Sequence, residues 1–144
     1  MTEIRTQISI KAAPEKIWDI LMNFEQYSRW NPFIISISGE KKVGKNLDVT
    51  IQPPDAKAMS FKPVILTLEP NKELRWSGKM FASFIFRGEH YFILQPNARG
   101  TTDFIHGEQF SGITLPLMKK MLEKTREGFE LMNQELKLLS ERPQ

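Results

Sequence analysis

The amphipathic stretch near the C-terminal end constrains the fold more than any other part of the sequence. Its mainly apolar residues recur at spacings of three and four, the period of one face of an α-helix. They are Leu115, Met118, Leu122, Thr125, Phe129, Met132, Leu136 and Leu139. We predict a helix of about seven turns over residues 114–140, with Thr114 as N-cap and Pro116 in the first turn. Such a helix needs an apolar partner surface, which we expect upstream, where the pattern is mostly that of strands.

The N-terminal part of the chain predicts one strand and two short helices. Residues 4–10 alternate between apolar and polar side chains, which indicates a strand with one buried face. A helix is predicted over residues 14–22, because proline is well tolerated in a first helical turn. Asn23 and Gln26 resemble a capping box for a second short helix that ends near Trp30.

The middle of the chain changes to a period of two and predicts six further strands. In the first of them, Phe33, Ile35 and Ile37 should share one face. Pro63 predicts an edge or a bulge within the third, because proline cannot donate to a strand ladder. The six predicted strands cover residues 33–38, 47–51, 59–68, 74–78, 84–94 and 101–110. Loops are predicted at residues 53–58 and 80–83.

This order of elements predicts an α+β fold. Consecutive strands joined by short turns form antiparallel meanders, and the helices would lie on one side of the sheet. A curved sheet that wraps round one long helix buries its inner face against that helix. Any space that the side chains leave unfilled there becomes a pocket. With 144 residues, we expect a single domain over residues 1–144.

Composition narrows the class of protein. Hydrophobic residues make up 40% and charged residues 26%, as in ordinary soluble proteins. The net charge is only +3, without a basic tract interleaved with aromatics, so we expect no nucleic-acid partner. There is no cysteine, which excludes disulfides and thiolate chemistry. Residues 1–7 are polar and no apolar run approaches membrane-spanning length, so we expect a cytoplasmic protein without stable membrane insertion.

The last predicted hairpin holds the candidate catalytic residues His90, His106 and Glu108. If its turn centres on residues 97–98, His90 lies opposite His106, and Gly88 opposite Glu108. Cross-strand neighbours on one face are about 5 Å apart. The two imidazoles and the carboxyl should therefore gather on a face otherwise made largely of phenylalanines.

Several interpretations of this cluster stay open. It forms a hydrogen-bonded structural patch, it orients a bound ligand, or it acts in acid–base catalysis because histidine titrates near neutral pH. By residue type a 2-His-1-carboxylate metal site is a further alternative, but neighbours on a flat sheet need not converge, and we predict no metal and no cofactor. The sequence has no Gly-x-Ser-x-Gly elbow, no cysteine and no Gly-rich phosphate loop, which disfavours an enzyme.

Aromatic and long apolar side chains predict the lining of a ligand-binding cavity. The predicted ligand-binding residues are Trp30, Phe33, Trp76, Phe84, Phe86, His90, Phe92, Phe104, His106, Glu108, Phe110, Met118, Leu122 and Phe129. Phe61, Met121 and Met132 would add to this wall, the methionines as adaptable side chains. The alternative is that these residues simply fill the core. Gly128, inside the predicted helix, allows either a close approach of another segment or room for a ligand.

Short segments near the start and in the last predicted hairpin form a recognisable set. Near the start they are APEKIWDIL (13–21), FEQY (24–27) and WNPF (30–33), and in the hairpin region they are GEHYF (88–92), GTT (100–102) and EQFSG (108–112). The first three resemble the start of the Bet v 1-like, START-related superfamily, and the last three resemble the last hairpin of its bacterial polyketide cyclase/dehydrase and lipid-transport branch. The resemblance spans nearly the whole chain. It implies a helix-grip fold, in which a seven-stranded curved antiparallel sheet wraps round the C-terminal helix and encloses a cavity.

The resemblance implies more than one function, because the superfamily includes lipid carriers, hormone receptors, cyclases and co-chaperones. Our leading hypothesis is a monomeric or homodimeric protein that binds or transports a small hydrophobic molecule, either lipid-like or aromatic and polyketide-like. Its entrance should lie near residues 53–58, residues 80–83 and the start of the last helix. The alternatives are a cyclase, dehydratase or hydrolase that uses the His/His/Glu cluster, and a co-chaperone-like interaction module with a broad exposed apolar patch.

Overall fold

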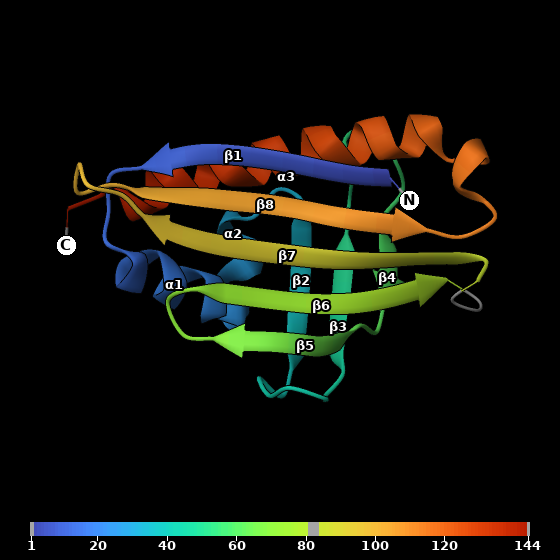
Figure 1. Cartoon of the computed structure of the whole chain (residues 1–144), viewed down its shortest axis with the longest axis horizontal. Helices are drawn as coiled ribbons and strands as arrows, with labels where there is room; N and C mark the ends of the chain where they lie inside the picture. The colour runs from blue at the N-terminus through green and yellow to red at the C-terminus, as the bar shows by residue number, and fades with distance from the viewer. Residues whose placement is uncertain (1, 81–83, 144) are drawn as a thin grey trace.

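A curved antiparallel sheet layer packs against one long C-terminal helix in the computed structural model, which describes residues 2–80 and 84–143 (Figure 1). The strands are β1 (Thr2–Ile10), β2 (Ile34–Gly39), β3 (Leu47–Ile51), β4 (Met59–Phe61), β5 (Val64–Glu69), β6 (Glu73–Met80), β7 (Phe86–Pro96) and β8 (Thr102–Ser111). The helices are α1 (Pro14–Met22), α2 (Tyr27–Trp30) and α3 (Lys119–Ser140), with single 3₁₀ turns at Phe24–Gln26 and Leu115–Leu117. This arrangement confirms the predicted α+β fold.

The strands form two antiparallel sheets whose edges are joined. One has the order β1-β8-β7-β6-β5 and the other the order β2-β3-β4. In Figure 1 the smaller sheet crosses behind the larger one, with α3 along one edge of the layer. Backbone hydrogen bonds connect the segment before β3 to β5, from Gly44 N to Ile65 O at 2.9 Å and from Ile65 N to Lys45 O at 3.0 Å. The inner face of the layer is therefore continuous.

The described residues form eight strands where seven were predicted. The predicted strand over residues 59–68 is divided at Lys62 and Pro63 into β4 and β5, which belong to different sheets. Proline has no N–H to donate, so a ladder tends to break where it occurs. The chain uses this break to turn from the smaller sheet into the larger one.

A bulge at the start of β2 changes the predicted alternation of Phe33, Ile35 and Ile37. The register with β3 shifts between Ile34 and Ser36. Phe33 and Ile34 are both buried as a result, whereas Ile35 is only half-buried. An extra residue on one strand reverses the facing of the residues before it, and this is why simple alternation failed here.

The first helices lie where they were predicted, but the predicted capping box is absent. Asn23 makes no side-chain cap hydrogen bond, and the chain passes through a 3₁₀ turn into α2. Instead, the buried hydroxyl of Tyr27 donates to the carbonyl oxygen of Leu21 at 2.6 Å. The Tyr27 side chain thus connects α2 to the end of α1, whereas a capping box between Asn23 and Gln26 was predicted.

The long helix starts later than predicted. Residues 115–117 form a separate 3₁₀ turn, and α3 begins at Lys119 after Met118. Thr114 does not cap it, because its hydroxyl donates to the carbonyl oxygen of Ile85 at 2.7 Å. The apolar pattern continues across this break, so periodicity alone could not locate it.

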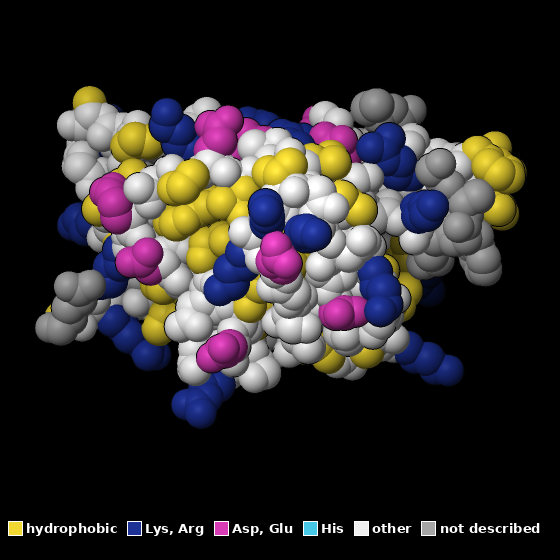
Figure 2. Space-filling view, turned by 90° about the horizontal axis from the view of Figure 1, so that it is seen from below, with side chains coloured by type: hydrophobic (Ala, Val, Ile, Leu, Met, Phe, Trp, Pro, Cys, Tyr) yellow, Lys and Arg dark blue, Asp and Glu magenta, His cyan; other side chains and the backbone are white. Residues whose placement is uncertain are grey.

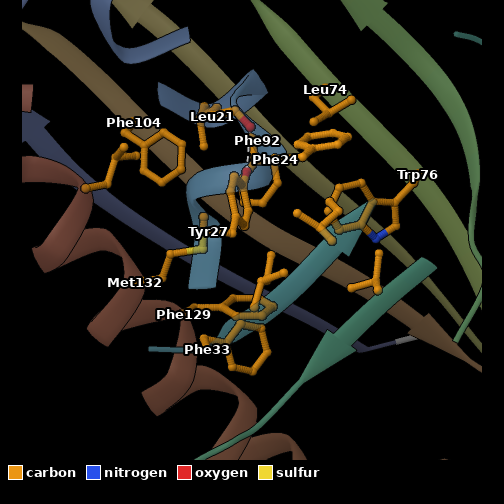
Figure 3. Packing of buried hydrophobic residues seen from close by; sticks show 14 of the residues in the cluster. Leu21, Phe24, Tyr27, Phe33, Leu74, Trp76, Phe92, Phe104, Phe129 and Met132 are labelled. Carbon is orange, nitrogen blue, oxygen red and sulfur yellow. Dashed lines mark hydrogen bonds between the residues drawn. The ribbon is translucent and has the colours of Figure 1, made fainter. Parts of the chain in front are cut away.

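At the centre of the core, α3 packs against the segment that leads into β2. Phe33 and Phe129 pack edge to face with ring centroids 5.4 Å apart, and Figure 3 shows them facing one another. A Cβ atom at Gly128 would collide with the Phe33 ring, so this glycine serves the close approach of another segment. None of the helices in the described part of the chain combines the length and apolar character that crossing a membrane requires.

Candidate functional site

The hairpin of β7 and β8 carries the candidate residues, but in a register that differs by two residues from the prediction. His90 lies opposite Glu108, and Phe92 lies opposite His106. The turn centres on Arg99, because Asn97 N donates to Thr101 O at 2.9 Å and Gly100 adopts φ +76°. A three-residue loop with glycine in the left-handed region is a common hairpin connection. The faces of the strands stay as predicted, since a shift of two residues preserves them.

A row of side chains crosses three strands on the inner face. Trp76 on β6 pairs with His90 on β7, and His90 pairs with Glu108 on β8. The Trp76 and His90 rings stack with their centroids 5.0 Å apart and an interplanar angle of 16°. The row therefore presents an aromatic wall followed by a carboxyl group.

The two histidines and Glu108 form a line of hydrogen bonds. Nδ1 of His90 lies 3.0 Å from Oε1 of Glu108, and Nε2 of His90 lies 2.9 Å from Nε2 of His106. The second histidine is fully buried and stacks on Phe129 with a centroid separation of 4.0 Å. The sequence-predicted catalytic candidates are thus brought together, in a line rather than around one point.

The line continues away from Glu108 to α3 and β1. Nδ1 of His106 lies 2.9 Å from Oδ1 of Asn133, and Nδ2 of Asn133 donates to Thr6 Oγ1 at 2.9 Å. The hydroxyl of Thr6 in turn donates to the carbonyl oxygen of His106 at 2.7 Å. All four polar side chains from His90 to Thr6 are buried. We call this set, from Glu108 through His90, His106 and Asn133 to Thr6, the polar chain.

Burial keeps the ionisable members of the polar chain neutral. It raises the pKa of Glu108 to about 8 and lowers the pKa of His90 to about 3. The pKa of His106 is lowered well below its ordinary value of 6.5, first by burial and then by the neighbouring His90. At neutral pH the chain is therefore a run of uncharged hydrogen-bonding groups.

A cavity of about 90 Å³ lies beside the Glu108 end of the polar chain. Its wall is aromatic and apolar with a small polar part, as in typical ligand sites. The lining residues are Phe33, Ile34, Ile51, Met59, Ser60, Phe61, Trp76, Gly78, Lys79, Phe86, Gly88, His90, Glu108, Phe110, Met121 and Thr125. The exposed residues Ser60 and Lys79 mark its mouth. Its volume is below the 150 Å³ or so of a cavity that holds benzene in another protein.

The predicted ligand-binding residues fall into three groups. Those that line the cavity are Phe33, Trp76, Phe86, His90, Glu108 and Phe110. Those that pack in or against the core outside the cavity lining are Trp30, Phe92, Phe104, His106, Met118, Leu122 and Phe129. Phe84, the remaining residue, precedes β7 and is 66% exposed. The sequence pattern therefore identified most residues of the inner face, but it did not distinguish those that line the cavity from those that pack in the core.

The three most exposed large apolar side chains of the described residues lie at one end of the molecule. They are Phe84, Ile113 and Leu117, at 66%, 72% and 86% exposure, and Ile113 N donates to Phe84 O at 3.0 Å. Figure 2 shows hydrophobic side chains at its right-hand end, whereas no histidine appears among the described residues on the face drawn. These three side chains form a smaller apolar patch than the broad one that we predicted for an interaction module.

The mouth lies near the predicted entrance. Met59 of β4 and Met121 of α3 line the cavity, next to the predicted loop over residues 53–58 and the start of α3. Of the predicted loop at residues 80–83, Met80 ends β6, and residues 81–83 lie outside the described part of the chain. Within the described ranges, no group of three His, Cys, Asp or Glu side chains is arranged to hold a metal ion.

Sequence reasoning missed Asn133 and Thr6 as members of the site. Both signals were present in the sequence. Asn133 follows Phe129 by four residues and so lies on the buried face of α3, and Thr6 is the one polar residue between Ile4 and Ile8 on the buried face of β1. A polar residue on an apolar face requires a partner, and here the two are partners of each other.

The fold is shared with many solved structures. A protein from Mesorhizobium loti, MLL2253, is 20% identical with a TM-score of 0.76, and the match covers 99% of each chain. The di-domain ARO/CYC protein StfQ from the steffimycin biosynthetic pathway is 15% identical with a TM-score of 0.71, over 96% of this chain and 50% of that one. Ara h 8.0201 is 14% identical with a TM-score of 0.64, over 94% and 97% of the two chains. No curated protein sequence matches the chain.

These similarities define the class first: the chain has the fold of Bet v 1-like proteins, as the sequence resemblance predicted. The family model extends this to a particular branch. The chain belongs to the family described as polyketide cyclase / dehydrase and lipid transport, whose model matches residues 1–139.

Proposed function

We propose that the protein binds a small hydrophobic molecule in the cavity between the sheet and α3. The observation that carries the proposal is the cavity itself, an aromatic and methionine-lined space with one polar end. Membership of a family described by cyclases and lipid transport supports it. Because the cavity is smaller than one that encloses benzene but opens at Ser60 and Lys79, the ligand would be a single ring that lies partly in the mouth or one end of a longer molecule.

The polar end would orient the ligand, with the predicted anchors in different roles. His90 and Glu108 line the cavity and can contact a ligand directly. His106 lies behind His90 at 2.9 Å and positions it. Met59 and Met121 give the wall flexible side chains that adapt to ligands of different shape.

An acid–base enzyme is the second candidate function, since the pKa of Glu108 is raised to about 8 at the wall of a cavity. Such groups are typical of acid–base catalysts. For any compound that the protein converts, Glu108→Gln should abolish conversion while binding persists. A conversion rate that Glu108→Gln leaves unchanged would remove Glu108 from this role.

A pair of tryptophan substitutions on α3 tests the binding proposal. Met121 lines the cavity, whereas Met118 packs against the core outside its lining. We expect p-xylene, an apolar single ring, to shift backbone amide NMR signals of cavity residues in the unmodified protein and in Met118→Trp. Met121→Trp should abolish these shifts by filling the cavity. Equal binding by both variants would place the ligand elsewhere.

Native mass spectrometry of the freshly purified protein gives an independent reading. A mass that exceeds the denatured mass by a few hundred daltons would reveal a co-purified ligand. Its loss in Met121→Trp but not in Met118→Trp would assign it to the cavity. The same spectra report the oligomeric state, which we predict to be a monomer or a homodimer in the cytoplasm.

A further inference from the structure

The hydrogens of the polar chain can be assigned from its fixed end. The carbonyl oxygen of His106 only accepts, so the Thr6 hydroxyl at 2.7 Å must donate to it. Thr6 Oγ1 has then spent its hydrogen and accepts from Nδ2 of Asn133. This orients the amide so that Oδ1 of Asn133 faces His106.

The two histidines follow from that orientation. Oδ1 of Asn133 only accepts, so Nδ1 of His106 carries a hydrogen. A neutral imidazole has one N–H, so Nε2 of His106 is bare. Nε2 of His90, 2.9 Å away, must therefore donate, because two bare nitrogens at this distance would repel. The neutral ring of His90 then has a bare Nδ1.

The last contact fixes the state of Glu108. Its Oε1 lies 3.0 Å from the bare Nδ1 of His90, so a hydrogen must lie between these two atoms. Because His90 and the groups behind it are buried, a charged imidazolium there is costly, and the hydrogen belongs to the carboxyl group. If it crosses to His90 and creates an ion pair, Oε2 of Glu108 still carries no hydrogen. Either way, the second carboxyl oxygen is an acceptor only.

The second oxygen faces the cavity. A Cβ atom on Gly88 would collide with Oε2 of Glu108, which places this oxygen over Gly88, and both residues line the cavity. Within the described part of the chain, Oε2 has no hydrogen-bond partner. Among the other polar lining groups, the Trp76 indole and Lys79 are donors. The hydroxyl of Thr125 donates its hydrogen to Met121 O at 2.8 Å, and that of Ser60 pairs with Thr50 Oγ1 at 2.8 Å, so Oε2 is the one carboxyl acceptor among the described lining residues.

We infer that the polar chain makes Glu108 a specificity residue, which selects neutral ring compounds carrying a hydroxyl or another hydrogen-bond donor for the cavity. This inference rests on the proposed function, because it concerns the ligand of the same cavity. A donor hydrogen-bonds to Oε2, whereas an apolar ring leaves that oxygen unpaired. Thr6 and Asn133 act only through the histidines and are positioning residues.

The test compares p-cresol with p-xylene, which differ by a hydroxyl in place of a methyl group. Both are titrated at neutral pH into the full chain and followed by backbone amide NMR. We expect p-cresol to bind more tightly, and Glu108→Leu to shift the ratio of the two dissociation constants toward p-xylene by about tenfold or more. Glu108→Gln should keep the ratio, because its amide N–H serves His90 and its carbonyl oxygen faces the cavity.

The outcomes separate the two proposals. Binding of p-xylene in preference to p-cresol, or an unchanged ratio in Glu108→Leu, overturns the specificity role and leaves the binding function standing. If neither p-xylene nor p-cresol binds, both the binding function and the specificity role are overturned.

Histidine NMR tests the hydrogen assignment without any variant. We expect the ¹⁵N spectra to show hydrogen on Nε2 of His90 and on Nδ1 of His106. The opposite tautomers, with hydrogen on Nδ1 of His90 and on Nε2 of His106, would reverse the chain and overturn the inference. This measurement keeps the inference testable even if Glu108→Leu fails to fold.

Discussion

Two regions of the same inner face differ although the same elements build both. At what we call the closed end, Phe92, Phe104 and His106 of the β7–β8 hairpin meet Phe129 and Met132 of α3, and all five are fully buried. At the open end, the strands contribute Phe86, Glu108 and Phe110, and α3 contributes Met121 and Thr125 around the cavity. At both ends, the strands contribute aromatic side chains to the inner face.

The difference lies in what faces the strands. At the closed end a phenylalanine and a methionine of α3 fill the space, and α1 and α2 cover the same end of the molecule in Figure 1. At the open end the helix offers a threonine and a half-buried methionine. Aromatic content alone therefore does not predict a cavity, and the volume of the opposing helix residues decides it.

The largest expected effect comes from emptying the closed end. Phe129→Ala should lower the free energy of unfolding by about 3–5 kcal/mol, because it removes a fully buried ring from a packed region. Phe86→Ala should cost less, about 2 kcal/mol, since that ring borders space that is already empty. Urea denaturation of both variants measures the contrast. Equal losses would mean that the two ends are packed alike.

The polar chain joins the two ends, and cutting it at Asn133 should have the next largest effect. Asn133→Leu leaves the Nδ1–H of His106 and the Oγ1 of Thr6 without their partner, at a cost of about 3 kcal/mol. Gln134→Leu, at the neighbouring exposed position, is the matched control and should be close to neutral. If both variants unfold at the same urea concentration, the chain contributes nothing to stability.

Titration of Glu108 gives the smallest of these effects. Its folded pKa of about 8 lies above its ordinary 4.5, so its stabilising contribution is complete below pH 4.5 and is lost as pH rises to about 8. The lowered pKa values of His90 and His106 act oppositely, because their contribution is present above pH 6.5 and lost on acidification.

Between pH 6.5 and 8 only Glu108 among these three titrates in the folded protein, whereas the two histidines still release protons in the unfolded chain, where their pKa is the ordinary 6.5. The unmodified protein should lose about 1 kcal/mol of unfolding free energy across this range, because a loss of about 2 kcal/mol from Glu108 is partly offset by the two histidines. Glu108→Gln, which cannot titrate, should show no such loss. Denaturation curves at the two pH values check this, and a parallel decline in both proteins would mean that Glu108 is already ionised at pH 6.5.

Much of the fold could be predicted because its elements leave local signals. The α+β order, α1 and the period of α3 all followed from residue spacing. The missed details have long-range causes. The hydroxyl of Thr114 donates to the carbonyl oxygen of Ile85, just before β7, instead of capping α3. Pro63 lies between β4 and β5, which belong to different sheets. Neither the contact of Thr114 nor the change of sheet at Pro63 can be inferred from the residues next to them in the sequence.

The candidate site was predictable in type but not in arrangement. His90, His106 and Glu108 were placed on one face because strand alternation is strict. Which of them touch depends on register, and the register depends on a loop outside the site. Asn133 is part of the site only because α3 packs against β1 in the tertiary structure. The cavity depends on volumes left unfilled, which no spacing rule reports.

The three-residue loop at the end of the β7–β8 hairpin has a consequence for how such a protein diverges. With Gly100 in the left-handed region, the loop pairs His90 with Glu108. A loop altered so as to slide the strands by two residues would keep every side chain on its face, yet bring His90 opposite His106. Insertions and deletions at this distant tip are therefore a route by which descendants of one gene acquire a new pocket chemistry while every pocket residue is inherited unchanged.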